Sequence, residues 1–334
     1  MNSVKVTIAC GAAAILVAHA VIATAQQRTD EMRGAGSFPN RPVRMVNPYT
    51  PGGSVDIVSR GVSAALSEMW GQQVIVDNRA GAGTVIGTEI VARADPDGYT
   101  VLCTSSAIAI MPALYRNLRF DTLRDLVPIV HVASSNSMLA VHPSVPAKSV
   151  KELIALARAH PGVLTAAVSG IGSTTHLTTE PFKTMAKVDV LIVPYKGGGP
   201  AMTDFIGGQV KMFFNSAAQF LPLMKGGKVR VLATSGAQRA DYAPDIPTVA
   251  ESGLPGFEAS TWFGIYGPRG FPAALTQRWN EAVNRYLETE QAKEYFGKAH
   301  MRRVGGSSAS FAQWHRSETA RWGKIVLSAG IKPQ

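Results

Sequence analysis

Short apolar runs alternate with segments of helical periodicity along most of this chain. The first run, 43–46, leads into the loop Asn47-Pro-Tyr-Thr-Pro-Gly-Gly53, and from Ser54 apolar residues recur at helical spacing until Gly71. This pattern predicts a strand, a tight loop and a helix with a glycine C-cap. Because the unit is repeated, we expect an α/β fold built on parallel strands with right-handed crossovers.

The strand–helix units fall into two blocks along the chain. The first block adds strands at 74–76 and 99–103, with a helix at 84–93 between them. The second block opens with the capping box Ser149-x-x-Glu152, which predicts a helix start. Its expected strands are 164–168, 190–193, 210–214 and 229–233, and its expected helices are 153–159, 174–186, 200–206 and 217–225. Two such blocks predict two lobes with a cleft between them.

The end of the chain completes this division. The Pro- and Gly-rich stretch 239–257 indicates a crossing between lobes, while 261–267 predicts a strand and 273–327 is mostly helical. We expect these helices to return to the first lobe. Lobe 1 is therefore assigned to 38–134 plus 260–334, and lobe 2 to 135–259. A length of 334 residues suits two such units better than one.

The N-terminal residues are typical of an export signal. A short positive start precedes an apolar stretch over 6–23, and Ala23-Thr24-Ala25 follows the small-x-small cleavage pattern. We predict a signal peptide over 1–25, cleaved near Ala25, and a flexible leader over 26–37. The mature protein is then expected in the periplasm.

Composition and charge exclude several classes of protein. The formal net charge is +10, but the positive residues are scattered, and the run Arg302-Arg303 is too short for a nucleic-acid interface. The histidines lack the spacing of metal ligands, so no metal and no cofactor are expected. Cys103 ends an apolar run and is expected to be a small buried residue, a catalytic thiol being the remote alternative.

Glycine-rich loops follow several of the expected strands and open the next helix. The first contains Gly52, Gly53, Ser54 and Asp56, where the glycines let a ligand approach the backbone, Ser54 can cap the helix, and Asp56 can hold the loop. The other loops are 169–176, 195–200 and 104–106. Helix N-termini carry unpaired N–H groups and partial positive charge, so several at one edge predict a carboxylate site.

Two enzymatic interpretations are weaker. Ser173 and His176 lie one helical turn apart and could form a nucleophile pair, but no Gly-x-Ser-x-Gly elbow is present, so helix capping by Ser173 and Thr174 is preferred. The segment Gly81–Gly87 resembles a dinucleotide loop, but its third glycine falls one position late and no strand directly precedes it. We expect no catalytic residues.

Several motifs resemble, in the same order, the Bug-type extracytoplasmic solute receptors of tripartite tricarboxylate transporters. The matching stretches are Pro39–Val43, Pro48–Asp56, Val76–Gly83, Pro96–Thr100, Val193–Gly197, Gly207–Val210, Ile246–Gly253 and Trp262–Gly264. The resemblance covers about 38–331. It implies a two-lobed periplasmic binding protein fold, type II-like, which closes by a hinge over a small carboxylate.

The resemblance also implies which residues form the site. The family grips a carboxylate with the first Gly-Gly loop and the Gly-x-Gly-Ser loop, which here correspond to Gly52, Gly53, Ser54 and Asp56, and to Gly172, Ser173 and Thr174. Tyr49 and Ser105 occupy matching cleft positions.

One departure bears on the ligand. Where the family often has Phe-Asp-Asn, this chain has Phe214-Asn215-Ser216, and Lys211 replaces a usual acidic residue. If Asn215 faces the cleft, the pocket favours a plain mono- or dicarboxylate over an amino acid. The expected partners are the ligand and membrane transporter subunits, and the receptor is expected to be monomeric. Two alternatives stay open: a receptor for a membrane sensor kinase, and a periplasmic hydrolase using Ser173 and His176.

Overall fold

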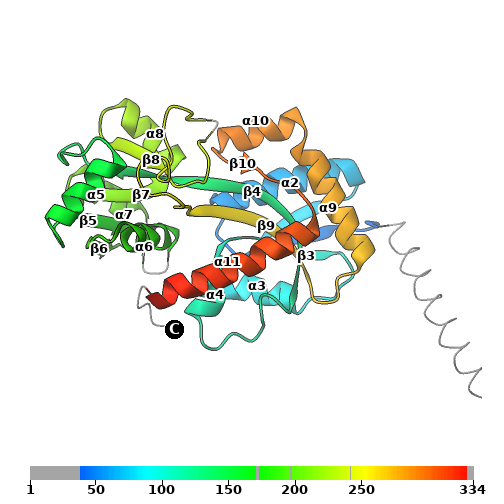
Figure 1. Ribbon diagram of the computed structural model, residues 1–334. Coiled ribbons are helices and arrows are strands. Elements are labelled where there is room, and N and C mark those ends of the chain that lie inside the picture. The colour runs from blue at the N-terminus through cyan, green and yellow to red at the C-terminus, as the bar shows by residue number, and fades with distance from the viewer. Residues whose placement is uncertain (1–37, 171–172, 196–197, 241, 329–334) are drawn as a thin grey trace, which may run out of the picture.

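The computed structural model describes residues 38–170, 173–195, 198–240 and 242–328. The expected signal peptide and leader, 1–37, lie outside these residues. The fold is α/β and two-lobed, with a curled sheet running through both lobes (Figure 1). Within the described residues, no helix combines the length and the apolar character needed to cross a membrane.

The first lobe is built as the sequence predicts. Parallel strands β1 (Val43–Asn47), β2 (Val74–Asn78) and β3 (Thr100–Ser105) pair in the order β2-β1-β3. Between them lie α2 (Ser54–Trp70), the 3₁₀ turn η1 (Ala82–Thr84) and α3 (Val85–Ala92). The predicted glycine cap is confirmed, since Gly71 ends α2 at φ 64°.

The second lobe repeats the pattern. Its strands are β5 (Thr165–Val168), β6 (Leu191–Pro194), β7 (Met212–Ser216) and β8 (Arg230–Thr234), and its helices are α5 (Val150–Ala159), α6 (Thr174–Ala186), α7 (Gly198–Ile206) and α8 (Ala217–Lys225). The predicted capping box is confirmed: Ser149 Oγ accepts from the Glu152 N–H at 3.1 Å. The strands β6, β5 and β7 pair in parallel, in that order.

The predicted parallel strands are present, but the sheet is mixed, because one long antiparallel strand runs through both lobes. β4 (Leu126–Val141) pairs antiparallel with β9 (Ser260–Pro268) and β10 (Arg302–Arg303) in one half, and with β7 and β8 in the other. Neither β4 nor α4 (Ala107–Leu114) is predicted from the sequence. The expected boundary at 134/135 falls within this continuous strand.

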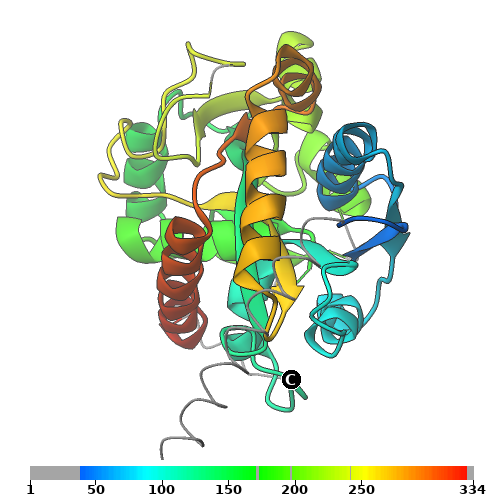
Figure 2. The same ribbon diagram turned by 90° about the vertical axis from the view of Figure 1, so that its right-hand side faces the viewer.

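The C-terminal helices pack on the first lobe. They are α9 (Ala273–Leu287), α10 (Glu290–Lys298) and α11 (Ser308–Ser328). Figure 2 shows α9 standing between α11 and the α2 side of the first lobe. The buried Trp279, Val283 and Phe296 share one core with Val58 and Leu66 of α2. The chain therefore crosses at least twice between lobes, through β4 and on the way into β9.

Cys103 is buried in this core, as the sequence predicts. Burial raises the pKa of its thiol to about 12, so the thiol stays protonated at ordinary pH. We expect native protein at about pH 8 to resist a thiol-specific reagent, and urea-unfolded protein to consume one equivalent once 1–25 is removed. Rapid reaction of the folded protein would contradict this placement.

Candidate functional site

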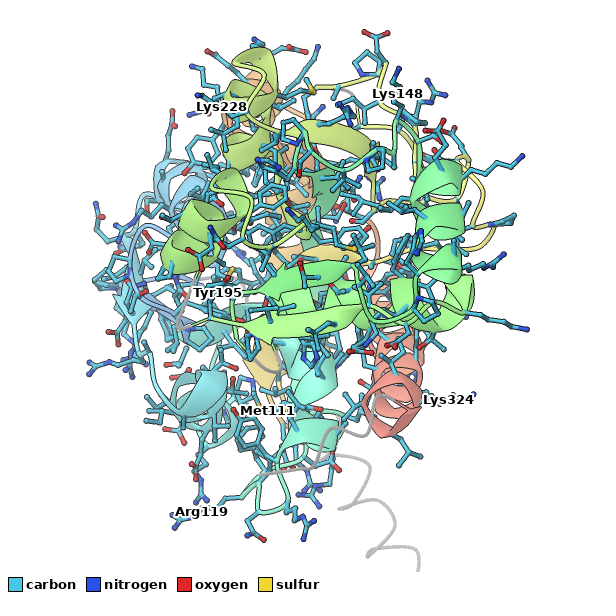
Figure 3. The ribbon with its side chains drawn as sticks, turned by 90° about the vertical axis from the view of Figure 1, so that its left-hand side faces the viewer. Met111, Arg119, Lys148, Tyr195, Lys228 and Lys324 are labelled. Atoms are coloured by element: carbon cyan, nitrogen blue, oxygen red, sulfur yellow. The ribbon has the colours of Figure 1, made fainter. Side chains whose placement is uncertain are left out.

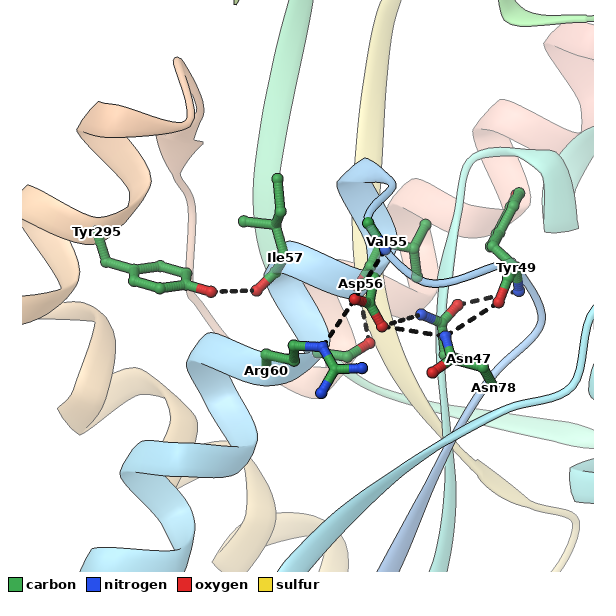
Figure 4. A network of polar contacts seen from close by, with 10 residues as sticks. Asn47, Tyr49, Val55, Asp56, Ile57, Arg60, Asn78 and Tyr295 are labelled. Atoms are coloured by element: carbon green, nitrogen blue, oxygen red, sulfur yellow. Dashed lines mark hydrogen bonds and ion pairs between the residues drawn. The ribbon is translucent and has the colours of Figure 1, made fainter.

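A buried carboxylate organises the loop between β1 and α2 (Figure 4). Asp56 Oδ2 accepts from the Gly52 N–H at 3.0 Å and from Arg60 Nε at 2.7 Å. Its Oδ1 accepts from Asn78 Nδ2 at 3.0 Å and from Asn47 Nδ2 at 3.4 Å. Burial alone would raise the pKa of Asp56, but the donors of Arg60, Gly52 and Asn78 outweigh it and lower the pKa to about 2. Asp56 therefore holds the loop as an anion.

Tyr49 connects this network to the end of β3. The Tyr49 hydroxyl lies 2.6 Å from Ser105 Oγ, and Asn78 Nδ2 donates to the Tyr49 carbonyl at 3.0 Å. Burial raises the pKa of the Tyr49 phenol to about 12, so it remains a neutral hydroxyl. Ser105 Oγ also accepts from the Ala107 N–H at 3.3 Å, at the start of α4. The ends of three strands are thus joined by hydrogen bonds.

The start of α2 is exposed and has no side-chain cap. Gly53 is the N-cap residue, with extended backbone at φ −82° and ψ 175°, so the prediction that Ser54 caps the helix is wrong. Ser54 is already helical, because the Gly53 carbonyl accepts the Ile57 N–H at 3.0 Å. Gly52 has φ +87°, a conformation that favours glycine. The first N–H groups of α2 have no intrahelical partner, and Gly52, Gly53 and Ser54 are exposed.

The start of α6 in the second lobe is capped by its own residues. Ser173 Oγ accepts from the His176 N–H at 3.3 Å and donates to the Gly170 carbonyl at 2.7 Å, which confirms the capping interpretation for Ser173. Thr174 is exposed at the first helical position. The predicted ligand residue Gly172 lies outside the described residues. Figure 3 views this lobe and labels Tyr195, just beyond β6.

The hydrolase alternative gains no geometric support. His176 is buried, and its Nε2 lies 3.4 Å from Glu180 one turn along α6. The Ser173 hydroxyl instead contacts Gly170 and, at 3.0 Å, Thr175 Oγ1. Ser173 and His176 thus make contacts with the first turns of α6 and with the loop before it.

Asn215 lies at the end of β7, beside the start of α8. Its Nδ2 donates to Gln219 Oε1 at 2.5 Å and its Oδ1 accepts from the Ser216 N–H at 2.8 Å. Within the described part of the chain, no hydrogen bond joins Asn215 to the first-lobe loops. The structure thus brings Tyr49, Gly52, Asp56 and Ser105 into one network and leaves Asn215 separate from it.

Residues of α6 in the second lobe and of α4 in the first lobe share one buried cluster. Leu177, on the first turn of α6, is buried in the same cluster as Ile108 and Ala109 of α4. α4 begins beside Ser105, whereas α6 begins beside Ser173. One cluster of buried side chains therefore includes the first turn of α6 and α4, the helix that begins beside Ser105.

Two residues of this network were missed in the sequence. Asn47 and Asn78 are the last residues of β1 and β2 and pair in register. Both amides donate to Asp56. The sequence feature that could have revealed them is an asparagine at the end of two successive strands, each followed by a glycine-rich loop.

In the segment Gly81–Gly87, Gly87 allows close packing against the loop after β1. A Cβ on Gly87 would lie 2.8 Å from the Arg79 carbonyl oxygen and 2.8 Å from Pro48 Cα, whereas Gly323 of α11 has open space around it. We expect Gly87→Ala to lower the free energy of unfolding by about 1–3 kcal/mol through overpacking against the loop. Gly323→Ala should instead raise it by about 0.5–1 kcal/mol. Urea denaturation of both variants checks the contrast, and equal effects would contradict it.

Comparison with known proteins identifies the family of the chain. Residues 58–331 match the model of the tripartite tricarboxylate transporter family receptor. The chain belongs to this receptor family. Protein BugT of Bordetella pertussis is 34% identical over 300 residues, which cover 89% of this chain and 92% of BugT. The family is one of solute-binding receptors.

Two solved structures of similar proteins contain carboxylates. R. palustris Rpa4515 with adipate is 36% identical, has a TM-score of 0.76 and matches 89% of the receptor and 100% of that chain. MatC (Rpa3494) from Rhodopseudomonas palustris with bound malate is 29% identical, has a TM-score of 0.70 and matches 86% of the receptor and 100% of that chain. Periplasmic binding protein BugD is 29% identical, has a TM-score of 0.73 and matches 89% of the receptor and 100% of that chain, which confirms the periplasmic binding protein fold.

Proposed function

We propose that this receptor captures a small mono- or dicarboxylate in the periplasm and delivers it to the membrane subunits of a tripartite tricarboxylate-type transporter. The observation that carries the proposal is the exposed, uncapped start of α2, which Asp56 fixes beside Tyr49 and Ser105. Helix starts of this kind bind anions through backbone N–H groups. The adipate and malate complexes of similar proteins support a carboxylate.

The residues divide into contact and support roles. Gly52, Gly53 and Ser54 offer backbone N–H groups to a carboxylate, and the start of α6 with Ser173 and Thr174 approaches it from the other lobe. Asp56 acts through the loop, because protein donors already occupy its oxygens. A ligand that binds both helix starts favours the closed state over the open one, which is what delivery requires.

Asn215 is proposed to tolerate the second carboxylate of a dicarboxylate. Its side chain is neutral and bonds only within β7 and α8 among the described contacts. We expect Asn215→Asp to weaken a dicarboxylate about tenfold through like-charge repulsion, and a monocarboxylate much less. Calorimetric titration of both ligand types measures the difference. No change in either affinity would place Asn215 outside the site, and equal weakening of both would contradict its assignment to the second carboxylate.

A ligand panel tests the function itself. The chain without residues 1–25 is screened by thermal shift against adipate, malate and other small carboxylates, and hits are titrated by calorimetry. We expect saturable binding of at least one, with about 2.7 kcal/mol of added stability at a hundredfold excess over Kd. Small-angle scattering should show a more compact receptor with ligand. No binding across the panel and no compaction would refute the proposal.

A further inference from the structure

A cavity of about 580 Å³ lies beside the strands that join the lobes, and none of the predicted ligand residues lines it. One wall is the segment after β8, including Arg239 and Tyr242, and the other comes from the end of α10, β10 and the start of α11. Figure 1 shows this segment approaching α10 and β10 above β4. Because both lobes form the walls, anything bound there touches both.

The floor of the cavity is the opposite face of the sheet from Ser105. Ser134 of β4 pairs with Trp262 on one side and Arg302 on the other, so these three side chains share a face. All three line the cavity. Ser105 pairs with Phe263, the residue after Trp262, and successive side chains point to opposite faces. The cavity is therefore separate from the Tyr49–Ser105 network.

The lining combines aromatic rings with polar atoms that lack partners. The His131 ring packs against Trp262, Phe311 and Trp314, with centroids 5.5–6.1 Å apart. Four buried atoms of lining residues have no hydrogen-bond partner among the described residues: His131 Nε2, Tyr242 Oη, His300 Nδ1 and Trp314 Nε1. Buried polar groups are costly when unpaired, so this concentration indicates a space built to receive polar atoms of another molecule.

The charge of the lining favours an anion. Four cations, Arg239, Lys293, Arg302 and Arg303, face one carboxylate, Glu258. Arg239 pairs with Glu251, Lys293 pairs with Glu290, and Arg303 donates to backbone carbonyls. Arg302 has no ion-pair partner among the described residues, and its charge acts on the neighbouring His131 ring. One cation beside the aromatic floor is thus available to a ligand.

We propose that this cavity is a second ligand site, for a small aromatic carboxylate whose ring lies against the partly exposed Trp314 and whose carboxylate pairs with Arg302. The volume lies within the range of pockets for small molecules. Tyr242 and His300, whose Oη and Nδ1 atoms are buried without a partner among the described residues, also line the cavity. Since its walls come from both lobes, occupancy is coupled to the angle between them.

The proposal is tested by titrating benzoate into the chain without residues 1–25. Calorimetry should give saturable binding with quenching of tryptophan fluorescence, because Trp314 lines the site. Arg302→Met should weaken binding about tenfold or more by removing the charged partner, and Arg302→Lys should restore part of it. Arg119→Met removes another exposed cation, at the far end of the molecule in Figure 3, and should leave binding unchanged.

A Gly53→Asp receptor separates this site from the proposed transport site. It should bind benzoate as the unmodified receptor does, since Gly53 does not line the cavity. Absence of binding up to roughly 10 mM benzoate would overturn the proposal. So would equal affinity of the Arg302→Met variant, or loss of benzoate binding in Gly53→Asp. The last result would assign benzoate to the glycine loop and leave the transport proposal intact.

Discussion

Gly53→Asp is expected to abolish carboxylate binding while leaving the receptor as stable as before or slightly more stable. Gly53 is the N-cap of α2 with extended backbone, and a Cβ there meets only the Thr50 carbonyl, at 3.9 Å. Aspartate is a favoured N-cap residue, so the fold should gain a few tenths of a kcal/mol. A ligand carboxylate about 4 Å from the new charge would lose about 4 kcal/mol, or roughly a thousandfold in affinity.

Gly53→Asn is the matched control. Asparagine has the same shape and caps helices equally well, but carries no charge. We expect it to weaken the ligand far less than aspartate does, and the ratio of the two Kd values isolates the charge. Calorimetry gives the affinities and thermal unfolding gives the stabilities. Equal affinities for the aspartate and asparagine variants would mean that no anion binds at the start of α2.

The largest expected loss of stability comes from Asp56→Asn. The substitution preserves volume but removes the buried anion that accepts from Gly52, Asn78 and Arg60. Since the amide presents an N–H₂ group to these donors, we expect the free energy of unfolding to fall by about 3 kcal/mol, together with ligand affinity. Asp77→Asn is the control, because Asp77 is half-buried and pairs with partly exposed arginines. It should cost about 1 kcal/mol or less.

The pH dependence follows from the lowered pKa of Asp56. Its folded-state value of about 2 lies below the ordinary 3.8, so the carboxylate stabilises the native state fully above about pH 4. That stabilisation, roughly 2 kcal/mol, is lost as pH falls through 2. The difference between the unmodified receptor and Asp56→Asn in urea denaturation should therefore be constant near neutrality and shrink in acid. A difference that stays constant down to pH 2 would contradict the assignment.

Local patterns were sufficient to predict most of the helices and parallel strands. α6 and α8 begin and end where their periodicity predicts, because each is amphipathic and bounded by a glycine, serine or lysine signal. The antiparallel arrangement could not be predicted in the same way. β4 contains the polar run Ser134–Ser137 where it crosses between lobes, and Pro128 near its start, so it lacks both alternation and a continuous apolar run.

The sequence predicted the type of site, a glycine-rich helix start, but not which of its residues support the loop. Gly52 and Gly53 stand at an exposed helix start because their spacing after a strand requires it. The Asp56 carboxylate accepts hydrogen bonds from Asn47 and Asn78, which lie side by side because β1 and β2 pair in register. No local sequence pattern predicts this long-range pairing. The cavity lined by Trp314 and Arg302, called the hinge cavity below, takes its lining from β4, β9, β10 and α11, which come together only in the folded chain.

A crystal structure of the receptor with the tightest ligand from the carboxylate panel tests the central claim most directly. We expect a carboxylate oxygen within about 3 Å of the backbone N–H groups at the start of α2, with the start of α6 contacting the same ligand. A ligand whose carboxylates touch neither helix start, whether in the hinge cavity or elsewhere, would contradict it.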